Sequence, residues 1–136
     1  MTEIRKIAVP TRRSGELGIH SLDHFSLAVP DVIEGARFYA ALGLEVRTES
    51  NGMALYTNGN PHRWGRLVDG PRKQLGHLSF GAFEDDLPRF KARLDEMRIT
   101  RLDPPAGHES NGLWFRDNDG KLIEIRVAEK TSPHEK

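Results

Sequence analysis

Two histidines and one glutamate stand in strand-like stretches of the chain, and together they could bind a metal ion. His24 lies in the stretch LDHFSLAVPD and His77 in LGHLSFGAFE, so leucine, histidine and serine recur at an offset of 53 residues. Glu124 lies between two isoleucines in the stretch KLIEIRV. Two imidazoles and one carboxylate that face one cavity bind Fe(II), Mn(II) or a similar divalent ion and leave positions open for a substrate.

The alternation of apolar and polar residues predicts where these side chains point. Successive side chains of a strand lie on opposite faces. Around His24 the large apolar residues take one face, and the histidine shares the other with Ser26 and Ala28; the same alternation separates His77 and Glu124 from their apolar neighbours. A carboxylate that is buried away from water on such a face needs a cation or a polar pocket. Taken singly, each histidine also fits a hydrogen-bonded structural role, and the glutamate fits a solvated position on an edge strand.

The elements that must position these residues repeat as well. Asp31 and Glu34 form a capping box that opens a predicted helix over 32–42, which Gly43 closes. A second helix is predicted over 87–98, where large apolar side chains line one helical face. Short extended runs follow each helix: LEVRTES, MALYTNG and WGRLVD after the first, and ITRLD, GLWFR and KLIEIRV after the second.

This order predicts two β-α-β-β-β modules in tandem, over about 20–70 and 73–128. Together they make one domain over 19–128, in keeping with the length of 136 residues. Residues 1–18 are expected to be an N-terminal extension of that domain. Residues 129–136 are expected to be a polar tail or a linker.

The composition restricts the classes of function. With 20 basic and 20 acidic residues the formal charge is zero, which gives no sign of nucleic acid or an anionic membrane as a partner. The chain has no cysteine, which excludes disulfides, thiolate metal sites and a cysteine nucleophile, and which favours a cytoplasmic location. No apolar stretch has the length of a signal-peptide core or a membrane span. We therefore expect a small-molecule substrate.

On these motifs the chain resembles the vicinal oxygen chelate superfamily, which includes glyoxalases, fosfomycin-resistance proteins, bleomycin-resistance proteins and extradiol ring-cleavage dioxygenases. The stretches LDHFSLAVPD and ARFYAALGLEV resemble its first module, and LGHLSFGAFEDDLPRFKARL followed by GLWFRDNDGKLIEIRV resembles its second. The resemblance implies an α+β fold in which two β-α-β-β-β modules form a curved mixed sheet around a metal held by His24, His77 and Glu124. One scaffold hosts several reactions in this superfamily.

Within the superfamily, the remaining histidines favour the extradiol dioxygenases. His62 lies fifteen residues before His77 and resembles, in placement, a histidine that assists at the bound oxygen in those enzymes. His108 lies in the loop before GLWF, where those enzymes carry a substrate-side histidine, although the loop is shorter here. The resemblance implies Fe(II), with Mn(II) or Zn(II) as alternatives, a catechol-like vicinal diol as substrate, His62 as acid and base, and His108 as a group that orients the substrate. Both histidines also fit exposed loop positions, and His20 and His134 are expected at the surface or in the tail.

Trp114 departs from the extradiol pattern. Ten residues before the glutamate ligand, those enzymes usually place a tyrosine that bonds the substrate, whereas an indole stacks and donates one N–H but has no acidic hydroxyl. Trp114 as a substrate-binding residue therefore implies a different substrate or a different activity. The ordinary extradiol chain also has two such domains, so we expect either a homodimer or a second similar domain as partner.

Other functions of the superfamily stay open. Glyoxalase I usually takes a second carboxylate from the end of the first module, but WGRLVDG contains no glutamate. Fosfomycin-modifying enzymes share the two histidines and the glutamate, but the lysine and arginine that they place around the phosphonate have no clear counterparts. A metal-dependent isomerase, lyase or transferase is one alternative. A bleomycin-resistance-like binding protein and an inactive metal-binding module are two more, although the complete ligand set favours an enzyme.

Overall fold

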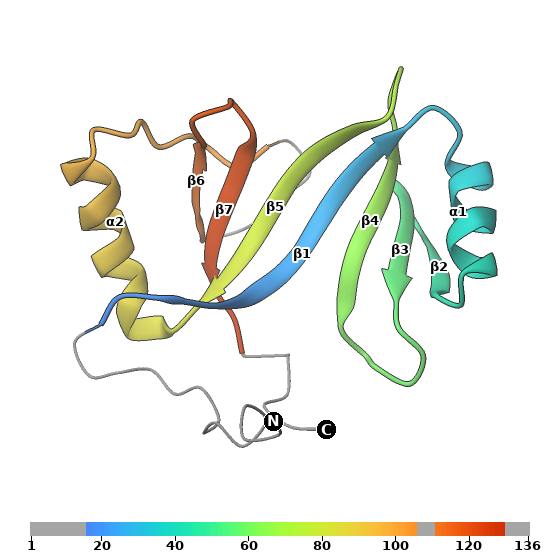
Figure 1. Ribbon diagram of the computed structural model, residues 1–136, viewed down its shortest axis with the longest axis horizontal. Helices are drawn as coiled ribbons and strands as arrows, with labels where there is room; N and C mark the ends of the chain where they lie inside the picture. The colour runs from blue at the N-terminus through green and yellow to red at the C-terminus, as the bar shows by residue number, and fades with distance from the viewer. Residues whose placement is uncertain (1–15, 106–110, 130–136) are drawn as a thin grey trace, which may run out of the picture.

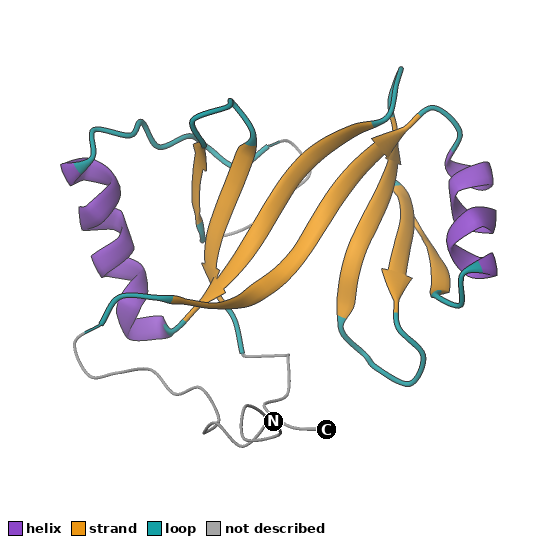
Figure 2. Ribbon diagram, viewed as in Figure 1, coloured by secondary structure: helices purple, strands orange, loops and turns teal. Residues whose placement is uncertain are grey.

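A seven-stranded mixed sheet runs through the computed structural model, which describes residues 16–105 and 111–129. The strand order is β2-β3-β4-β1-β5-β7-β6. The long strands β1 and β5 cross the middle of the molecule, and the helices α1 and α2 lie at its opposite ends (Figures 1 and 2). The elements are β1 (Ile19–Val29), α1 (Val32–Ala41), β2 (Glu45–Glu49), β3 (Gly52–Tyr56), β4 (Arg63–Asp69), β5 (Gln74–Ala82), the 3-10 helix η2 (Glu84–Asp86), α2 (Leu87–Glu96), β6 (Leu113–Arg116) and β7 (Leu122–Val127).

The sheet consists of the two predicted modules joined edge to edge. In the first module β1 pairs with β4 in parallel, and in the second β5 pairs with β7 in parallel. The two modules meet where β1 and β5 pair in the antiparallel direction. The expected α+β fold of two tandem modules is thereby confirmed.

Both predicted helices form, and the start of the first one follows the predicted capping chemistry. The side chain of Asp31 accepts a hydrogen bond from the backbone N–H of Glu34 at 3.0 Å. Gly43 follows the helix with a φ of 105°, a conformation that glycine adopts without strain. The second helix begins at Leu87 as expected and ends slightly earlier than predicted, at Glu96.

One extended run does not become a strand. The stretch ITRLD contributes a single bridge, in which the backbone N–H of Leu102 donates to the carbonyl of Trp114 at 2.7 Å. Pro104 and Pro105 follow directly. Proline has no N–H to donate to a strand ladder, so the pairing stops after one bridge.

Among the described residues, the buried apolar side chains form two clusters, one beneath each helix. The cluster beneath α1 contains Val29, Leu55 and Leu67, and the cluster beneath α2 contains Ala82, Leu94, Leu113 and Ile125. Phe25 packs directly on Gly65 of β4, where an added Cβ would lie 2.4 Å from the ring. The apolar faces of the strands thus pack toward the helices, as the alternation predicted, and the opposite faces carry the polar residues.

The predicted domain limits stay a prediction. Residues 1–15 and 130–136 lie outside the described residues, so the structure describes little of the expected extension and tail. Among the described helices, none is long and apolar enough to cross a membrane.

Candidate metal centre

The structure brings together the two histidines and the glutamate that the sequence singled out. They come from three neighbouring strands: His24 from β1, His77 from β5 and Glu124 from β7. The strand register places Ser79 between His24 on one side and Glu124 on the other. One ligand atom from each of the three residues lies within 4.8 Å of the other two.

The donor atoms fit a divalent metal ion. The Nε2 atoms of His24 and His77 lie 3.3 Å apart. Two nitrogens that bind one ion with bonds of about 2.1 Å lie about 3.0 Å apart at a right angle and about 3.4 Å apart at a tetrahedral angle. His77 and Glu124 are 3% and 1% exposed, so the carboxylate lies where a cation offsets the cost of its burial. The set of two imidazoles and one carboxylate therefore has the spacing and the chemistry of a centre for Fe(II), Mn(II) or Zn(II).

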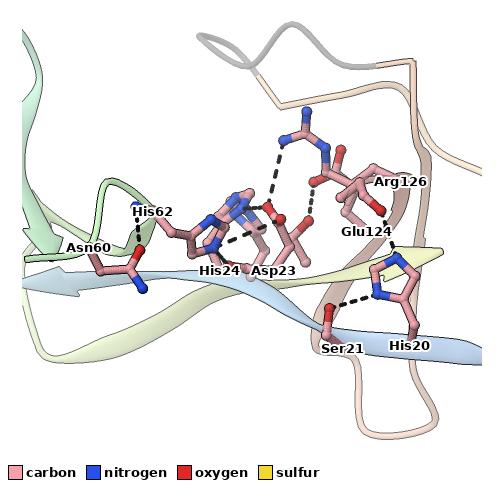
Figure 3. A network of polar contacts seen from close by, with 11 residues as sticks. His20, Ser21, Asp23, His24, Asn60, His62, Glu124 and Arg126 are labelled. Atoms are coloured by element: carbon pink, nitrogen blue, oxygen red, sulfur yellow. Dashed lines mark hydrogen bonds and ion pairs between the residues drawn. The ribbon is translucent and has the colours of Figure 1, made fainter. Parts of the chain in front are cut away.

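The carboxylate of Asp23 forms a hydrogen bond with the ring of His24, the next residue in the chain. Asp23 Oδ2 lies 2.7 Å from His24 Nδ1, and Figure 3 shows the two side chains in contact. A carboxylate only accepts, so Nδ1 carries the hydrogen and Nε2 of the neutral ring keeps its lone pair. Burial raises the pKa of Asp23, but the hydrogen bond with His24 and the charges of His24, Arg126 and His62 outweigh burial, and the pKa lies below its usual value.

Glu124 is fixed by a buried hydroxyl and by a glycine. Ser79 Oγ donates to Glu124 Oε1 at 2.6 Å, and both side chains are buried. A Cβ at Gly112 would lie 2.7 Å from Glu124 Oε2, so the backbone before β6 passes against the carboxylate. In the first module the equivalent strand register pairs Ser26 with Arg66, so an arginine stands where the second module has its glutamate.

His62 is half-buried and contacts Asp23, the residue before the first histidine. Its Nε2 lies 2.6 Å from the backbone carbonyl of Asp23, and its ring packs edge-on against Trp64 with centroids 4.4 Å apart. Asn60 accepts a hydrogen bond from the backbone N–H of His62 at 2.8 Å (Figure 3). Since a carbonyl only accepts, Nε2 carries a hydrogen, and Nδ1 is the basic nitrogen of the neutral ring.

Trp114 forms a wall of the centre. It is 1% exposed, lies opposite Glu124 in the pairing of β6 with β7, and packs edge-on against the ring of His77 with centroids 4.9 Å apart. The indole therefore touches one candidate ligand directly. Its predicted contact with a substrate stays a prediction.

The predictions for the three remaining histidines have different outcomes. His20 was expected at the surface or in the tail, but it is half-buried in β1, and its Nε2 lies 2.6 Å from the carbonyl of Ala128. The first residues of β1 pair with the end of β5, and this brings His20 close to the residue that follows β7. His108 and His134 lie outside the described residues.

Sequence reasoning missed Asp23 and Ser79, which hydrogen-bond to the candidate ligands His24 and Glu124. Strict alternation places Asp23 on the apolar face, opposite His24. The register of β1 with β5 shifts between Leu22 and His24, and this irregularity brings Asp23 beside the histidine. The signal in the sequence was a charged residue inside an apolar run, the same feature that drew attention to Glu124.

The comparisons with known proteins agree with this arrangement. A family model described as Glyoxalase/Bleomycin resistance protein/Dioxygenase superfamily matches residues 21–125. "Metapyrocatechase 2" from Cupriavidus necator is 36% identical over 118 residues, which cover 87% of this chain and 37% of that protein. The chain thus spans little more than a third of this curated relative.

Solved structures share the fold. The 2,3-dioxygenase LapB from Pseudomonas sp. KL28 matches with a TM-score of 0.70 and 21% identity, over 82% of this chain and 41% of that chain. The Mn(II)-bound glyoxalase from Novosphingobium aromaticivorans matches with a TM-score of 0.65 and 17% identity, over 84% of this chain and 42% of that chain. At this identity the likeness is evidence for the fold of the two modules.

Proposed function

This chain belongs to the glyoxalase/bleomycin resistance protein/dioxygenase superfamily, and from that membership we propose that it is a metal-dependent dioxygenase of the extradiol type. Its substrate is a catechol-like vicinal diol. The observation that carries the proposal is the group of His24, His77 and Glu124 within 4.8 Å, because two histidines and one carboxylate with open positions are typical of non-haem Fe(II) oxygenases. The identity of 36% with metapyrocatechase 2 supports this choice within the superfamily.

Fe(II) is the proposed ion, and Mn(II) or Zn(II) fits the same donors. When bound, a divalent ion lowers the pKa of a coordinated hydroxyl and leaves positions open for the substrate. His24 and His77 would hold the ion through their Nε2 atoms, and Glu124 would hold it through a carboxylate oxygen. Ser79 keeps the carboxylate in place through its hydroxyl hydrogen bond.

His62 is the proposed acid and base. Its Nε2–H is engaged with the carbonyl of Asp23, so the proton of a substrate hydroxyl moves to and from Nδ1. The contact with Asp23 supports this role because it fixes the ring against the residue that precedes His24. His108 is proposed to orient a substrate oxygen. This role is based on the resemblance to the extradiol dioxygenases, because His108 lies outside the described residues.

Trp114 is the proposed determinant of substrate choice. Its ring packs against the ring of His77, at the position where the extradiol pattern has a tyrosine. An indole has no hydroxyl that can lose a proton, so proton transfer falls to His62.

A metal-dependent isomerase, lyase or transferase is the second candidate, because the fold also matches the Mn(II)-bound glyoxalase. The register of the first module argues against a glyoxalase with a second carboxylate. Arg66 stands at the position equivalent to Glu124, and an arginine cannot bind a cation. A bleomycin-resistance-like binding protein, which needs no metal, and an inactive metal-binding module are the remaining alternatives.

The proposed partner is a second copy of this chain or a second similar domain. The relatives support it, because the chain spans only 37% of metapyrocatechase 2 and 41% of the LapB dioxygenase. Helix α1 also exposes the large apolar side chains of Ile33 and Phe38, and Leu42, which follows the helix, is exposed as well. We expect a dimer by light scattering, no partner among nucleic acids or membranes, and a cytoplasmic location, which rests on the composition.

The test is metal analysis of protein purified without oxygen, followed by oxygen uptake on a panel of catechols. Iron near one per chain, with uptake and a yellow ring-cleavage product, supports the dioxygenase. Bound metal without uptake favours the isomerase, lyase or transferase, and absence of metal favours the binding protein. His24→Ala should lose metal and uptake, whereas His20→Ala, on the same strand but bonded to Ala128, should keep both.

A further inference from the structure

Asp23 contacts two histidines through two different oxygen atoms. Its carboxylate Oδ2 lies 2.7 Å from His24 Nδ1, and its backbone carbonyl lies 2.6 Å from His62 Nε2 (Figure 3). We propose that Asp23 is a positioning residue, which fixes the tautomer of His24 through its side chain and that of His62 through its main chain. This inference rests on the proposed function for the roles of the two histidines.

The side-chain contact decides which nitrogen of His24 is free to bind a metal. A neutral imidazole carries one hydrogen, and the carboxylate holds it on Nδ1. Nε2 then presents a lone pair toward His77 Nε2, 3.3 Å away. With the hydrogen on Nε2, His24 would donate to His77 and an N–H would occupy the place of the ion. Asp23 therefore selects the metal-binding tautomer.

A bulge in β1 brings the Asp23 carboxylate into this position. Leu22 pairs with Phe80 and His24 with Ser79, so β1 advances by two residues while β5 advances by one. Asp23 is the extra residue. Such bulges redirect a side chain, and here the redirected side chain is 11% exposed and hydrogen-bonded to the ring of the next residue. The bulge in β1 therefore accounts for the contact between Asp23 and His24.

The other charges near Asp23 lie farther away. Arg126 Nη1 is 3.8 Å from Oδ2, and His62 Nε2 is 4.0 Å from Oδ1. The side chain of Arg126 is 42% exposed, and ion pairs of this kind contribute little. The main partner of the carboxylate is therefore His24, and Arg126→Gln should change the behaviour of His24 much less than a change at Asp23.

The test compares the wild type with Asp23→Asn. An amide can donate or accept, so it no longer dictates the tautomer of His24, while the backbone carbonyl that contacts His62 is unchanged. Nitrogen NMR of metal-free protein should show hydrogen on Nδ1 of His24 in the wild type and loss of that preference in the variant. The hydrogen on Nε2 of His62 should remain in both. Mn(II) affinity, measured by titration with the ion alone, should fall about 10- to 100-fold.

Asp69→Asn provides the matched control, because Asp69 is exposed at the end of β4. It should leave the tautomers and the Mn(II) affinity as in the wild type. Hydrogen on Nε2 of His24 in the wild type would overturn the inference even if Asp23→Asn fails to fold. So would a folded Asp23→Asn protein with the wild-type tautomer and affinity. If the wild type binds neither Mn(II) nor Fe(II), the proposed function fails, and the tautomers of the metal-free protein still decide the role of Asp23.

Discussion

The Nε2 atoms of His24 and His77 face each other at 3.3 Å across the seam between the two modules. Two lone pairs at this distance repel, so an N–H of one ring or a cation must lie between them. With the hydrogen of His24 held on Nδ1 by Asp23, a cation placed beside the carboxylate of Glu124 satisfies all three groups. Removal of the cation or of one of the three groups should therefore change metal affinity and the stability of the folded protein.

Bound metal should stabilise the folded protein. An ion that binds only the native state contributes about 2.7 kcal/mol when its concentration is 100 times its dissociation constant. Urea unfolding with Mn(II) and with a chelator should therefore differ by about this amount in the wild type. His77→Ala should show the same unfolding free energy under both conditions. Equal stabilisation of that variant by Mn(II) would place the binding site elsewhere.

Glu124→Ala should lose the metal and keep the fold. The residue supplies the only carboxylate of the group that the structure brings together, and the clusters beneath the helices do not include its side chain. Metal content per chain should fall toward zero, while the circular dichroism spectrum stays that of the wild type. Glu96→Ala, on the exposed last turn of α2, is the matched control and should retain its metal. Unchanged stoichiometry in the Glu124 variant would refute its role as a ligand.

Gly112→Ala should damage the centre without removing any ligand. The new Cβ would lie 2.7 Å from Glu124 Oε2 and 2.8 Å from the carbonyl of Ile125, so the carboxylate or the strand must shift. We expect at least tenfold weaker Mn(II) binding and about 1–3 kcal/mol lower stability, as for other overpacked sites. Gly18→Ala meets nothing within 4 Å and should change neither quantity. Wild-type affinity in the Gly112 variant would show that the carboxylate tolerates the shift.

Arg98→Gly should stabilise the protein. Arg98 follows α2 with a φ of 62°, a left-handed conformation that costs a residue with a Cβ about 1–2 kcal/mol. Glycine adopts it freely, although it loses more entropy on folding, so we expect a net gain of about 0.5–1 kcal/mol in chemical unfolding. Arg93→Gly, inside the helix, should have the opposite sign, with a loss of about 1 kcal/mol. A loss at both positions would contradict the left-handed helix end.

Much of the fold was predictable because its local signals agree. The repeat at an offset of 53 residues, the capping residue Asp31 and the alternation in the strands all indicated the two modules that the structure shows. The three candidate ligands followed from the same alternation, since side chains on one face of adjacent strands meet. Position within a strand was enough to bring His24, His77 and Glu124 together.

The remaining features depend on contacts that alternation does not encode. A one-residue bulge places Asp23 beside His24, and only the pairing with β5 reveals it. The bond from His62 to the carbonyl of Asp23 joins residues 39 positions apart. The run around Leu102 had strand-like residues, but the prolines that follow limit it to one bridge.

The two modules repeat one strand arrangement, but the repeat is not symmetric at the candidate metal centre. Ser79 pairs with Glu124 in the second module, and Ser26 pairs with Arg66 in the first. The two modules therefore have the same residue, a serine, on the first strand of this pair but different residues on the second strand. A symmetric duplicate would surround an ion with four protein donors. Arg66 offers no fourth donor, and its guanidinium lies 3.4 Å from Glu49. If the chain is the proposed dioxygenase, the first module would therefore leave its side of the ion to the substrate and not to a protein ligand.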